Sequence, residues 1–511
     1  MPNGGSDCCG NCILNEANES GFNPNGKHYC KLRIVEINNP FWTYCGNFID
    51  RRWSNKESRK TDIINGPIYA SGIYEGYVRI PWNGKNEPET YVSGICSVTG
   101  NQFSEGIRVF DDKSQDYKYF ESNVIYFKWF KNTYPNETLP FDYSYENNNS
   151  IEKIDLHKIY TEIYKQDFLK VDFIHLGKEL NLGENELEFE LLQNKVRGTL
   201  IGGAVGDALG RAVESINPGN YWIEKYEKWH GWKSGVIGTI TDDTQMTMWL
   251  TESIIENKGL NPEHLAIKFT TQRIRGIGIA TKEFVANFTD KKLPWYNSGV
   301  NSAGNGVAMR SSPIGIFYRN NYEELKLAAG IQAVITHNDQ MAISSGIVVS
   351  LAIALLLRKN SDSLSDLNNK IEFCQILSSS IEGIESKNEY KTRNTNITTN
   401  IFQRIKYEIP DLLKNGIHPK EVNEIFWSGA YVLESLPFAI YCFLYTPCDF
   451  KTTLLNSVNL IRDSDTVSSI ACSLSGALNS LDSIESYYTE NLEYYDYLNE
   501  LAEKLTVVSS Y

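Results

Sequence analysis

The C-terminal part of the chain, from about residue 190 onward, has the residue spacing of packed helices almost throughout. Apolar or small residues recur three and four positions apart in SSGIVVSLAIALLLRK, EVNEIFWSGAYVLESLPFAIYCFLY and TVSSIACSLSGALNSL, which is the period of a helix with a buried face. Strand signals are almost absent from this part of the sequence. The pattern therefore predicts an all-α domain over residues 190–511.

The N-terminal part has a different pattern, and with 511 residues the chain is long enough for two or three domains. Short alternating runs such as GIYEGYVRIPW and ETYVSGICSVTG are typical of strands and turns. One amphipathic helix is predicted within IEKIDLHKIYTEIYKQDFLK, after the polar stretch PFDYSYENNNS. We predict a multidomain protein with a Cys-rich module at 1–60, a β-rich domain at 61–145, a linker with a helix at 146–189, and the helical domain at 190–511.

The composition is that of a globular protein, with 41% hydrophobic residues and a formal net charge of −14 at pH 7. The negative charge argues against general nucleic-acid binding, because a duplex is itself densely negative. The N-terminus has neither the basic start nor the apolar core of a secretory signal. The longest apolar run, SSGIVVSLAIALLLR, is too short to span a membrane, so we expect a soluble, cytoplasmic protein.

The ten cysteines are crowded toward the N-terminus. Cys9 and Cys12 form a close pair that is followed by the single residues Cys30 and Cys45, a set that can close a structural Cys₄ zinc site. Cys8 could replace Cys9, and free, packed thiols are the alternative. The four later cysteines lie in apolar helical sequence and are interpreted as small core residues: Cys374, Cys442, Cys448 and Cys472.

Two acidic clusters each precede a helical run. Asp242 and Asp243 stand between threonines in TDDTQM, and RDSDTVSSIACSLSGAL contains Asp463, Asp465 and Thr466. An isolated pair of this kind would be read as an N-cap and a first-turn acid. Two such clusters at separate helix starts can instead supply hard oxygen ligands from both sides of one Mg²⁺ or Mn²⁺ site, and two ions about 3.5–4 Å apart can share such a set.

Three further motifs carry residues of interest. GGAVGDALGRAVES contains Asp207 and Glu214, for which a helix cap and a surface acid are the alternatives. In NSAGNGVAMRSSPIG, residues 304–306 (Gly-Asn-Gly) can expose successive backbone N–H groups to a phosphate, or simply form a turn. His337, in VITHNDQMAISSG, precedes an apolar helix, where a lone histidine is more often a cap or a packed residue than a catalyst.

The motifs RGTLIGGAVGDALG, TDDTQM, GNGVAMRSSPIG, THNDQMA and RDSDTVSSIACSLSGAL occur in one order. Their order and rough spacing resemble those of the ADP-ribosylglycohydrolase family, which contains dinitrogenase-reductase-activating glycohydrolases and ADP-ribosyl-acceptor hydrolases. The resemblance covers about residues 190–485. It implies an all-α domain with a binuclear Mg²⁺ or Mn²⁺ centre in a central cleft, where ADP-ribose binds with its distal ribose against the metal ions.

The resemblance also implies roles for individual residues. Glu214 would lie beside the site and is the candidate for proton transfer, with Asp243 or a metal-bound water as the competing assignments. Many relatives have two glycines where this chain has Ile461 and Arg462, and Arg462 could reach a phosphate or the leaving group, or be an ordinary solvated arginine. The implied metal ligands are Thr241, Asp242, Asp243, Asp463, Asp465 and Thr466, and the implied contacts to ADP-ribose are Gly304, Asn305, Gly306, Met309 and His337.

The predicted function is that of a metal-dependent hydrolase that removes ADP-ribose from a modified acceptor, with arginine on a protein as the first choice. Hydrolysis of a small conjugate such as O-acetyl-ADP-ribose is the close alternative. A second alternative is an immunity-type binding protein that shields a target from an ADP-ribosylating toxin through its N-terminal region. The four retained aspartates of the two clusters favour the enzyme. The N-terminal region is also a candidate surface for a protein partner.

Overall fold

The computed structural model describes residues 154–183, 187–214, 221–226, 237–271, 274–385, 390–393, 397–459 and 461–510 continuously, together with separate segments between residues 29 and 134. The chain divides into two compact units. One contains Met1–Asn148 and Lys228–Thr239, and the other contains Asn149–Glu227 and Ile240–Tyr511. The domain boundaries expected from the sequence stay predictions.

In the N-terminal unit, the strands β5 (Gly76–Tyr77), β6 (Glu89–Ile95), β7 (Gln102–Asp111) and β8 (Asp116–Phe120) form one antiparallel sheet in that order. Two antiparallel pairs are also described, β1 (Tyr29–Cys30) with β2 (Val35–Glu36) and β3 (Thr43–Cys45) with β4 (Ile68–Ala70). Most of residues 1–148 and the side chains of Cys9, Cys12, Cys30 and Cys45 lie outside the described residues. A Cys-rich, β-rich region with a zinc site therefore stays a prediction.

A small aromatic core accompanies the four-stranded sheet. Val109 and Phe120 come from paired strands, and Tyr126, Phe130 and Tyr134 follow β8 in the sequence; all five are buried together. The rings of Phe120 and Tyr126 lie 5.5 Å apart at a tilted angle, an arrangement that aromatic rings favour over face-to-face stacking.

The second unit is helical, as the sequence pattern predicts. Its elements up to the middle of the unit are α2 (Leu156–Lys165), α3 (Phe189–Gly210), α4 (Asp242–Asn257), α5 (Pro262–Thr271), α6 (Ile279–Val285), η3 (Ala286–Asp290), α7 (Trp295–Ser298), α8 (Ser312–Phe317), α9 (Tyr322–Thr336), α10 (Gln340–Leu356), η4 (Ser361–Leu364) and α11 (Leu367–Ser380). The remaining elements are β9 (Tyr390–Lys391), β10 (Thr398–Thr399), α12 (Ile401–Gln403), η5 (Arg404–Glu408), α13 (Ile409–Lys414), α14 (Pro419–Phe426), α15 (Val432–Tyr445), α16 (Phe450–Asn459), α17 (Ser464–Asn479), η6 (Leu481–Ser483), α18 (Ser486–Glu490) and α19 (Tyr495–Val508).

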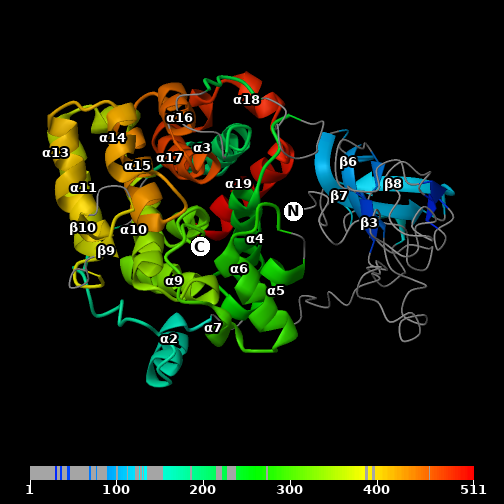
Figure 1. Ribbon diagram of the computed structural model, residues 1–511, viewed down its shortest axis with the longest axis horizontal. Helices are drawn as coiled ribbons and strands as arrows, with labels where there is room; N and C mark the ends of the chain where they lie inside the picture. Colours follow the sequence, from blue (N-terminus) through cyan, green and yellow to red (C-terminus); the bar gives the residue numbers. More distant parts are fainter. Residues whose placement is uncertain are drawn as a thin grey trace, which may run out of the picture. The chain divides into compact units, whose positions relative to one another are not determined.

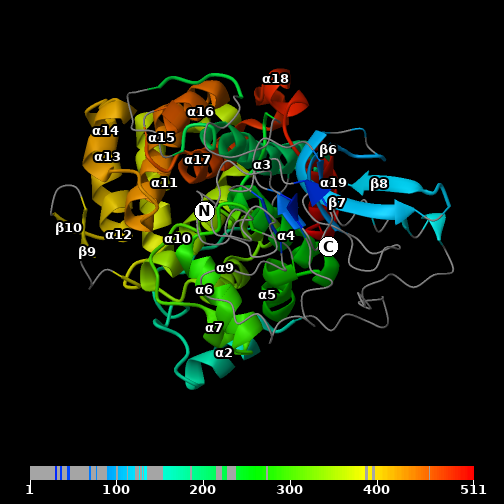
Figure 2. The same cartoon turned by 45° about the vertical axis from the view of Figure 1, so that its right-hand side comes forward.

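Helices α3 and α17 pack against each other and lie side by side in both views (Figures 1 and 2). Their contact is made by glycine and serine. A Cβ atom placed on Gly476 would lie 1.9 Å from the carbonyl oxygen of Gly198. Ser468 Oγ donates to the carbonyl oxygen of Gly206 at 2.7 Å, and Ser464 Oγ to that of Gly210 at 2.8 Å. The backbones approach this closely because side chains are absent or short.

The apolar run that opens near residue 344 forms α10, whose residues are almost all buried. Asp339 is its N-cap, and its side chain accepts from the backbone N–H of Met341 at 2.8 Å. Within the described residues, no helix has the length and apolar character needed to cross a bilayer. Three of the four later cysteines are buried as expected, but Cys448 is exposed and its thiol donates to the carbonyl oxygen of Ser361 at 3.1 Å.

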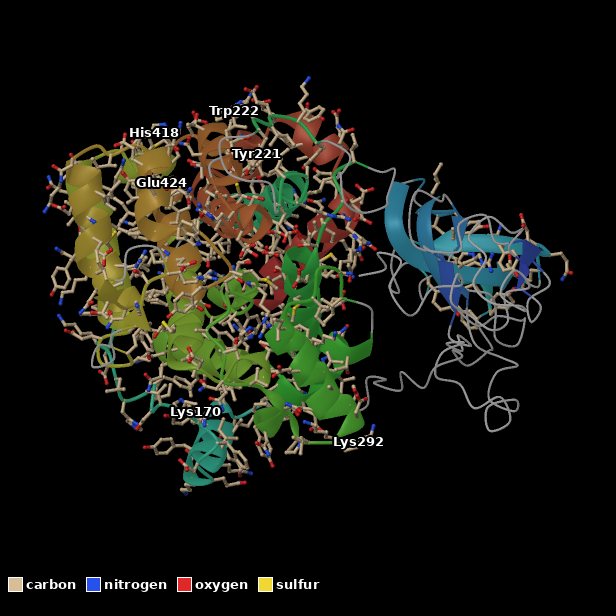
Figure 3. The ribbon with its side chains drawn as sticks, viewed as in Figure 1. Lys170, Tyr221, Trp222, Lys292, His418 and Glu424 are labelled. Atoms are coloured by element: carbon tan, nitrogen blue, oxygen red, sulfur yellow. The ribbon has the colours of Figure 1, made fainter. Side chains whose placement is uncertain are left out.

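The predicted linker helix is shorter than its periodic segment. It begins after the N-cap Asp155 and ends at Lys165, since Asp167 has a left-handed φ of 59°. The irregular chain that follows lies along α9: Lys326 donates from Nζ to the carbonyl oxygen of Ile174 at 3.3 Å. Lys170, which Figure 3 labels, donates from its backbone N–H to Asn338 Oδ1 at 3.4 Å. This segment therefore contacts the turn between α9 and α10.

Candidate active site

The two acidic clusters lie at the N-termini of α4 and α17, as the sequence predicts. Thr241 is the N-cap of α4, and its hydroxyl accepts from the backbone N–H of Asp243 at 3.3 Å. Asp463 occupies the N-cap position of α17 and Asp465 lies in its first turn. The positive end of a helix dipole stabilises negative charge, so each helix start favours its own carboxylates.

The structure brings carboxylates from three helix ends together. Ligand oxygens of Asp207, Asp243 and Asp465 all lie within 4.8 Å of one another, and so do those of Glu214, Asp463 and Asp465. Asp465 belongs to both groups and joins them into one carboxylate cluster, defined here as these five residues. Asp242 belongs to neither group as described, and it is only half-buried.

Asp207 caps α4 from the neighbouring helix α3. Its carboxylate accepts from Thr241 through the backbone N–H at 2.9 Å and the hydroxyl at 2.8 Å. It also accepts from Thr244 through the backbone N–H at 3.1 Å and the hydroxyl at 2.5 Å. Burial first, and then the negative charge of Asp465, raise the pKa of Asp207 to about 6. The sequence left open that Asp207 caps a helix, and this is confirmed. The helix is α4, which begins 35 residues after Asp207.

Asp243 has one oxygen engaged and one without a partner. Its Oδ2 accepts from the hydroxyls of Thr241 at 3.1 Å and Thr466 at 3.3 Å. Its Oδ1 is buried and has no hydrogen-bond partner among the described residues. Burial, and then the charge of Asp465, raise the pKa of Asp243 and of Asp463 well above the ordinary carboxyl value. A buried, unpartnered carboxylate oxygen among hydroxyl and carboxylate donors fits a hard divalent cation.

Glu214 stands at the edge of the carboxylate cluster. It follows the end of α3, where its backbone N–H donates to the carbonyl oxygen of Gly210 at 3.1 Å, and it is half-buried. The negative charge of Asp465 first, and then burial, raise the pKa of Glu214 to about 8. It is therefore part of the cluster and not the surface acid that the sequence left open.

The glycine loop, residues 303–309, lies on the other side of the site. Val432 N–H donates to the carbonyl oxygen of Ala303 at 2.9 Å, and Asn305 N–H to that of Ala430 at 3.2 Å. The loop thus pairs with the segment that leads into α15. The backbone N–H of Asn305 is bound by the protein and does not face a ligand. The side chain of Asn305 donates from Nδ2 to Asp463 Oδ2 at 2.6 Å and so connects the loop to the carboxylate cluster.

His337 lies beneath the glycine loop and is 3% exposed. A Cβ atom on Gly304 or Gly306 would lie 3.1 or 2.9 Å from its imidazole, so both glycines pack directly on the ring. Burial, and then the positive charge of Arg310, lower the pKa of His337 to about 3. His337 is a neutral, packed residue here. Met309 is also buried, and its carbonyl oxygen accepts from the Thr247 hydroxyl at 3.4 Å.

Arg462 is held by an aromatic ring beside the site. Its guanidinium carbon lies 3.4 Å from the centre of the Trp427 ring, and Nη1 donates to the Trp427 carbonyl oxygen at 3.1 Å. Its backbone N–H donates to Ser428 Oγ at 3.3 Å. The freely solvated arginine considered from the sequence is thus not what the structure shows.

Two residues near the cluster carry no signal in the sequence. Arg275 and Glu493 form an ion pair with Nη1 and Oε2 2.6 Å apart, across 218 positions of the chain. Neither residue lies in one of the motifs, and local spacing cannot reveal a contact over that distance. Asp207 lies in one of the motifs, but its hydrogen bonds to α4 are equally beyond what a local pattern can reveal.

The chain is similar to known proteins over its helical unit. The sequence model of the ADP-ribosylglycohydrolase family matches residues 189–510. ADP-ribosylhydrolase ARH3 of Homo sapiens is 25% identical over 352 residues, which is 61% of this chain and 93% of that protein. ADP-ribosyl-[dinitrogen reductase] glycohydrolase of Rhodospirillum rubrum is 23% identical over 59% of this chain and 91% of that protein. ADP-ribosylarginine hydrolase Tri1 of Pseudomonas putida is 20% identical over 61% of this chain and 78% of that protein.

Proposed function

The chain belongs to the ADP-ribosylglycohydrolase family, and we propose that its carboxylate cluster is a divalent metal site that removes ADP-ribose from modified arginine side chains of proteins. The observation that carries this proposal is the meeting of Asp243, Asp463 and Asp465 from two helix N-termini, with a buried oxygen of Asp243 left without a partner. The choice of arginine is supported by a relative named for ADP-ribosylarginine hydrolysis.

Two Mg²⁺ or Mn²⁺ ions are the proposed cofactors. Some oxygen-bearing side chains of the site would bind these ions directly, and others hold the binding residues in place. Asp243, Asp463 and Asp465 offer carboxylates, and Asp242 adds one at the more exposed edge. The hydroxyls of Thr241 and Thr466 already lie against Asp243. Asp207, whose two oxygens accept from α4, holds that helix in place. Bound divalent ions would supply Lewis acidity to the ribose hydroxyls and to a water molecule.

We assign proton transfer to Glu214 because of where it lies in the carboxylate cluster. Cleavage breaks the bond between ribose C1″ and a guanidinium nitrogen; water adds its oxygen to C1″, and one proton must reach the departing nitrogen. Asp243 is 1% exposed and accepts two hydroxyls, so it is poorly placed to meet that nitrogen. Glu214 lies at the half-exposed edge of the cluster, where an acceptor enters and leaves.

The glycine loop is the proposed binding element for ADP-ribose. Gly304 and Gly306 pack on the neutral ring of His337, so the loop presents backbone and no bulky side chain. Met309, the last residue of the loop, is buried. We assign phosphate and ribose contacts to this loop and the lining of the same pocket to His337.

The direct test measures free ADP-ribose released from an arginine-ADP-ribosylated protein, with Mg²⁺ and with excess EDTA. The wild-type chain should release ADP-ribose only with the metal. Asp463→Ala should lower the rate by at least about 100-fold, because a ligand matters at least as much as the partners that orient ligands. Asp482→Asn, an exposed acid outside the cluster, should keep the wild-type rate.

The outcomes separate the candidate functions. If EDTA does not reduce the release of ADP-ribose, the proposed requirement for a metal ion is wrong. Release from a serine-linked conjugate or from O-acetyl-ADP-ribose, but not from arginine, would replace the acceptor and keep the chemistry. If ADP-ribose binds and no conjugate is hydrolysed, the binding-protein alternative takes the place of the enzyme.

A further inference from the structure

Both backbone groups of Ile240, the residue before the α4 N-cap, are bound by one ion pair. The Ile240 N–H donates to Glu493 Oε2 at 3.1 Å, and its carbonyl oxygen accepts from Arg275 Nη1 at 3.1 Å. The ion pair itself is bidentate: Arg275 Nη1 lies 2.6 Å from Glu493 Oε2, and Nη2 lies 3.0 Å from Oε1. The three residues close a ring of directional contacts immediately before the first carboxylates of α4.

The backbone around Arg275 also contacts the start of α4. Arg275 N–H donates to Oε1 of Gln245, in the first turn of α4, at 2.8 Å. The next residue, Gly276, has a φ of 66°, and a Cβ atom there would lie 3.0 Å from Asp242 Oδ1. Segment 275–276 therefore lies against the side of the turn that carries Asp242.

The position of Glu493 makes this contact a long-range one. Glu493 lies between α18 and α19, and its side chain is fully buried; that of Arg275 is 10% exposed. Helix α19 packs beside α4 and α3 in both views (Figures 1 and 2). The C-terminal end of the chain thus supplies the acid that holds the start of α4.

A buried ion pair is a weak source of stability, because removing two charges from water offsets most of their attraction. Apolar residues of the same size would fill the space as well. A bidentate pair, however, offers a donor and an acceptor in fixed directions. Here they bind the carbonyl group and the N–H of one residue, Ile240, whose carbonyl oxygen also accepts from Arg211 Nη1 at 3.5 Å. The distinctive contribution of Arg275 and Glu493 is therefore the placement of the turn at Ile240, two residues before Asp242.

We propose that Arg275 and Glu493 are positioning residues of the metal site, which hold the 240–243 turn so that Asp242 and Asp243 reach the cations. This inference rests on the proposed function, because it presupposes that the cluster binds a divalent metal. Partners that orient metal ligands typically change metal affinity by about 10- to 100-fold when replaced. The pair binds Ile240 on both sides, and the Arg275 backbone binds Gln245 in the first turn of α4, so its effect should fall on the metal.

The test measures Mn²⁺ and Mg²⁺ binding to the full-length protein by calorimetry, without substrate, alongside the thermal unfolding midpoint with and without metal. Glu493→Gln keeps the shape and removes the charge, and Arg275→Lys keeps the charge and removes the fork. Both should weaken metal binding by about 10- to 100-fold. At saturating metal, both should leave the KM of the conjugate within about twofold and lower kcat, since the glycine loop is untouched.

The matched control is the partly exposed ion pair between Arg197 of α3 and Glu503 of α19. Glu503→Gln removes one charge from the same helix α19 and should leave metal affinity unchanged. If Glu493→Gln fails to fold, Arg275→Lys carries the test alone. Metal affinity equal to wild type in a folded variant, with only the unfolding midpoint lowered, would leave the pair a purely structural contact. Absence of metal binding by the wild-type chain would instead overturn the proposed function and this inference with it.

Discussion

The two sides of the site are built by different kinds of contact. On the carboxylate side, α3 and α17 meet through glycine and serine, and a methyl group on Gly476 would collide with Gly198. On the loop side, residues 303–305 pair with residues 430–432, more than a hundred positions away in the chain. The first kind of contact leaves a local pattern of small residues and capping acids. The second kind of contact leaves almost no local sequence pattern. Substitutions on the two sides should therefore have different effects on stability and activity.

Gly476→Ala should disrupt the contact between α3 and α17 on the carboxylate side more than any other substitution considered. The added Cβ atom would lie 1.9 Å from the Gly198 carbonyl oxygen, so the two helices must separate. Overpacking of this kind lowers the free energy of unfolding by about 3 kcal/mol, which urea unfolding will measure. Catalysis should fall with it, because both acidic clusters depend on the spacing of these helices.

Gly278→Ala provides the matched control for that substitution. Its φ of −68° suits any residue, and a Cβ atom there would meet nothing within 4 Å. Gly278 is the N-cap of α6, where glycine is preferred over alanine, so we expect a loss of unfolding free energy of about 1 kcal/mol or less. Equal stability losses at Gly476 and Gly278 would show that close approach of α3 and α17 does not hold the carboxylate side.

The sequence was informative where structure depends on near neighbours. The spacing of apolar residues predicts the helical unit, and TDDTQM and RDSDT predict two helix starts with their acids. What it could not supply are contacts between distant segments. The hydrogen bonds from α4 to Asp207 and the pairing of Arg275 with Glu493 join distant segments that no periodicity relates.

The same limit explains the glycine loop and the exposed cysteine. Three consecutive N–H groups in residues 304–306 are available in principle to an anion, but Asn305 N–H pairs with Ala430, a partner that only the fold brings close. Cys448 follows an apolar helix yet faces outward, because it lies in the turn between α15 and α16. Composition predicts burial on average and cannot place a single turn residue.

His337 gives the loop side a dependence on pH that the carboxylate side does not share. The folded chain holds its imidazole at a pKa of about 3, below the ordinary 6.5. Between these values the unfolded chain binds a proton that the folded chain does not, so the stability is complete above about pH 6.5 and is lost as the pH falls. At pH 5 the loss is about 2 kcal/mol for this residue.

The difference between variants isolates that effect from other titrating groups. His337→Gln should lower the stability at pH 7 through lost packing on Gly304 and Gly306. The further decrease between pH 7 and pH 5, measured by urea unfolding, should be smaller than in the wild type by about 2 kcal/mol. Parallel pH profiles for the two proteins would mean that His337 keeps its ordinary pKa in the folded chain.

Asn305 links the two sides of the site through its side chain, and its replacement should have the smallest of these effects. Its Nδ2 donates to Asp463 Oδ2 at 2.6 Å, so Asn305→Ala leaves that carboxylate free to turn while its helix stays in place. Loss of such an orienting partner should lower kcat by about 10-fold, with the unfolding midpoint changed little because Asn305 is on a loop. A rise in KM without a fall in kcat would assign Asn305 to the loop side alone. A fall in kcat with unchanged KM would show that the loop also orients a metal ligand, and that the two sides work as one site although they are built separately.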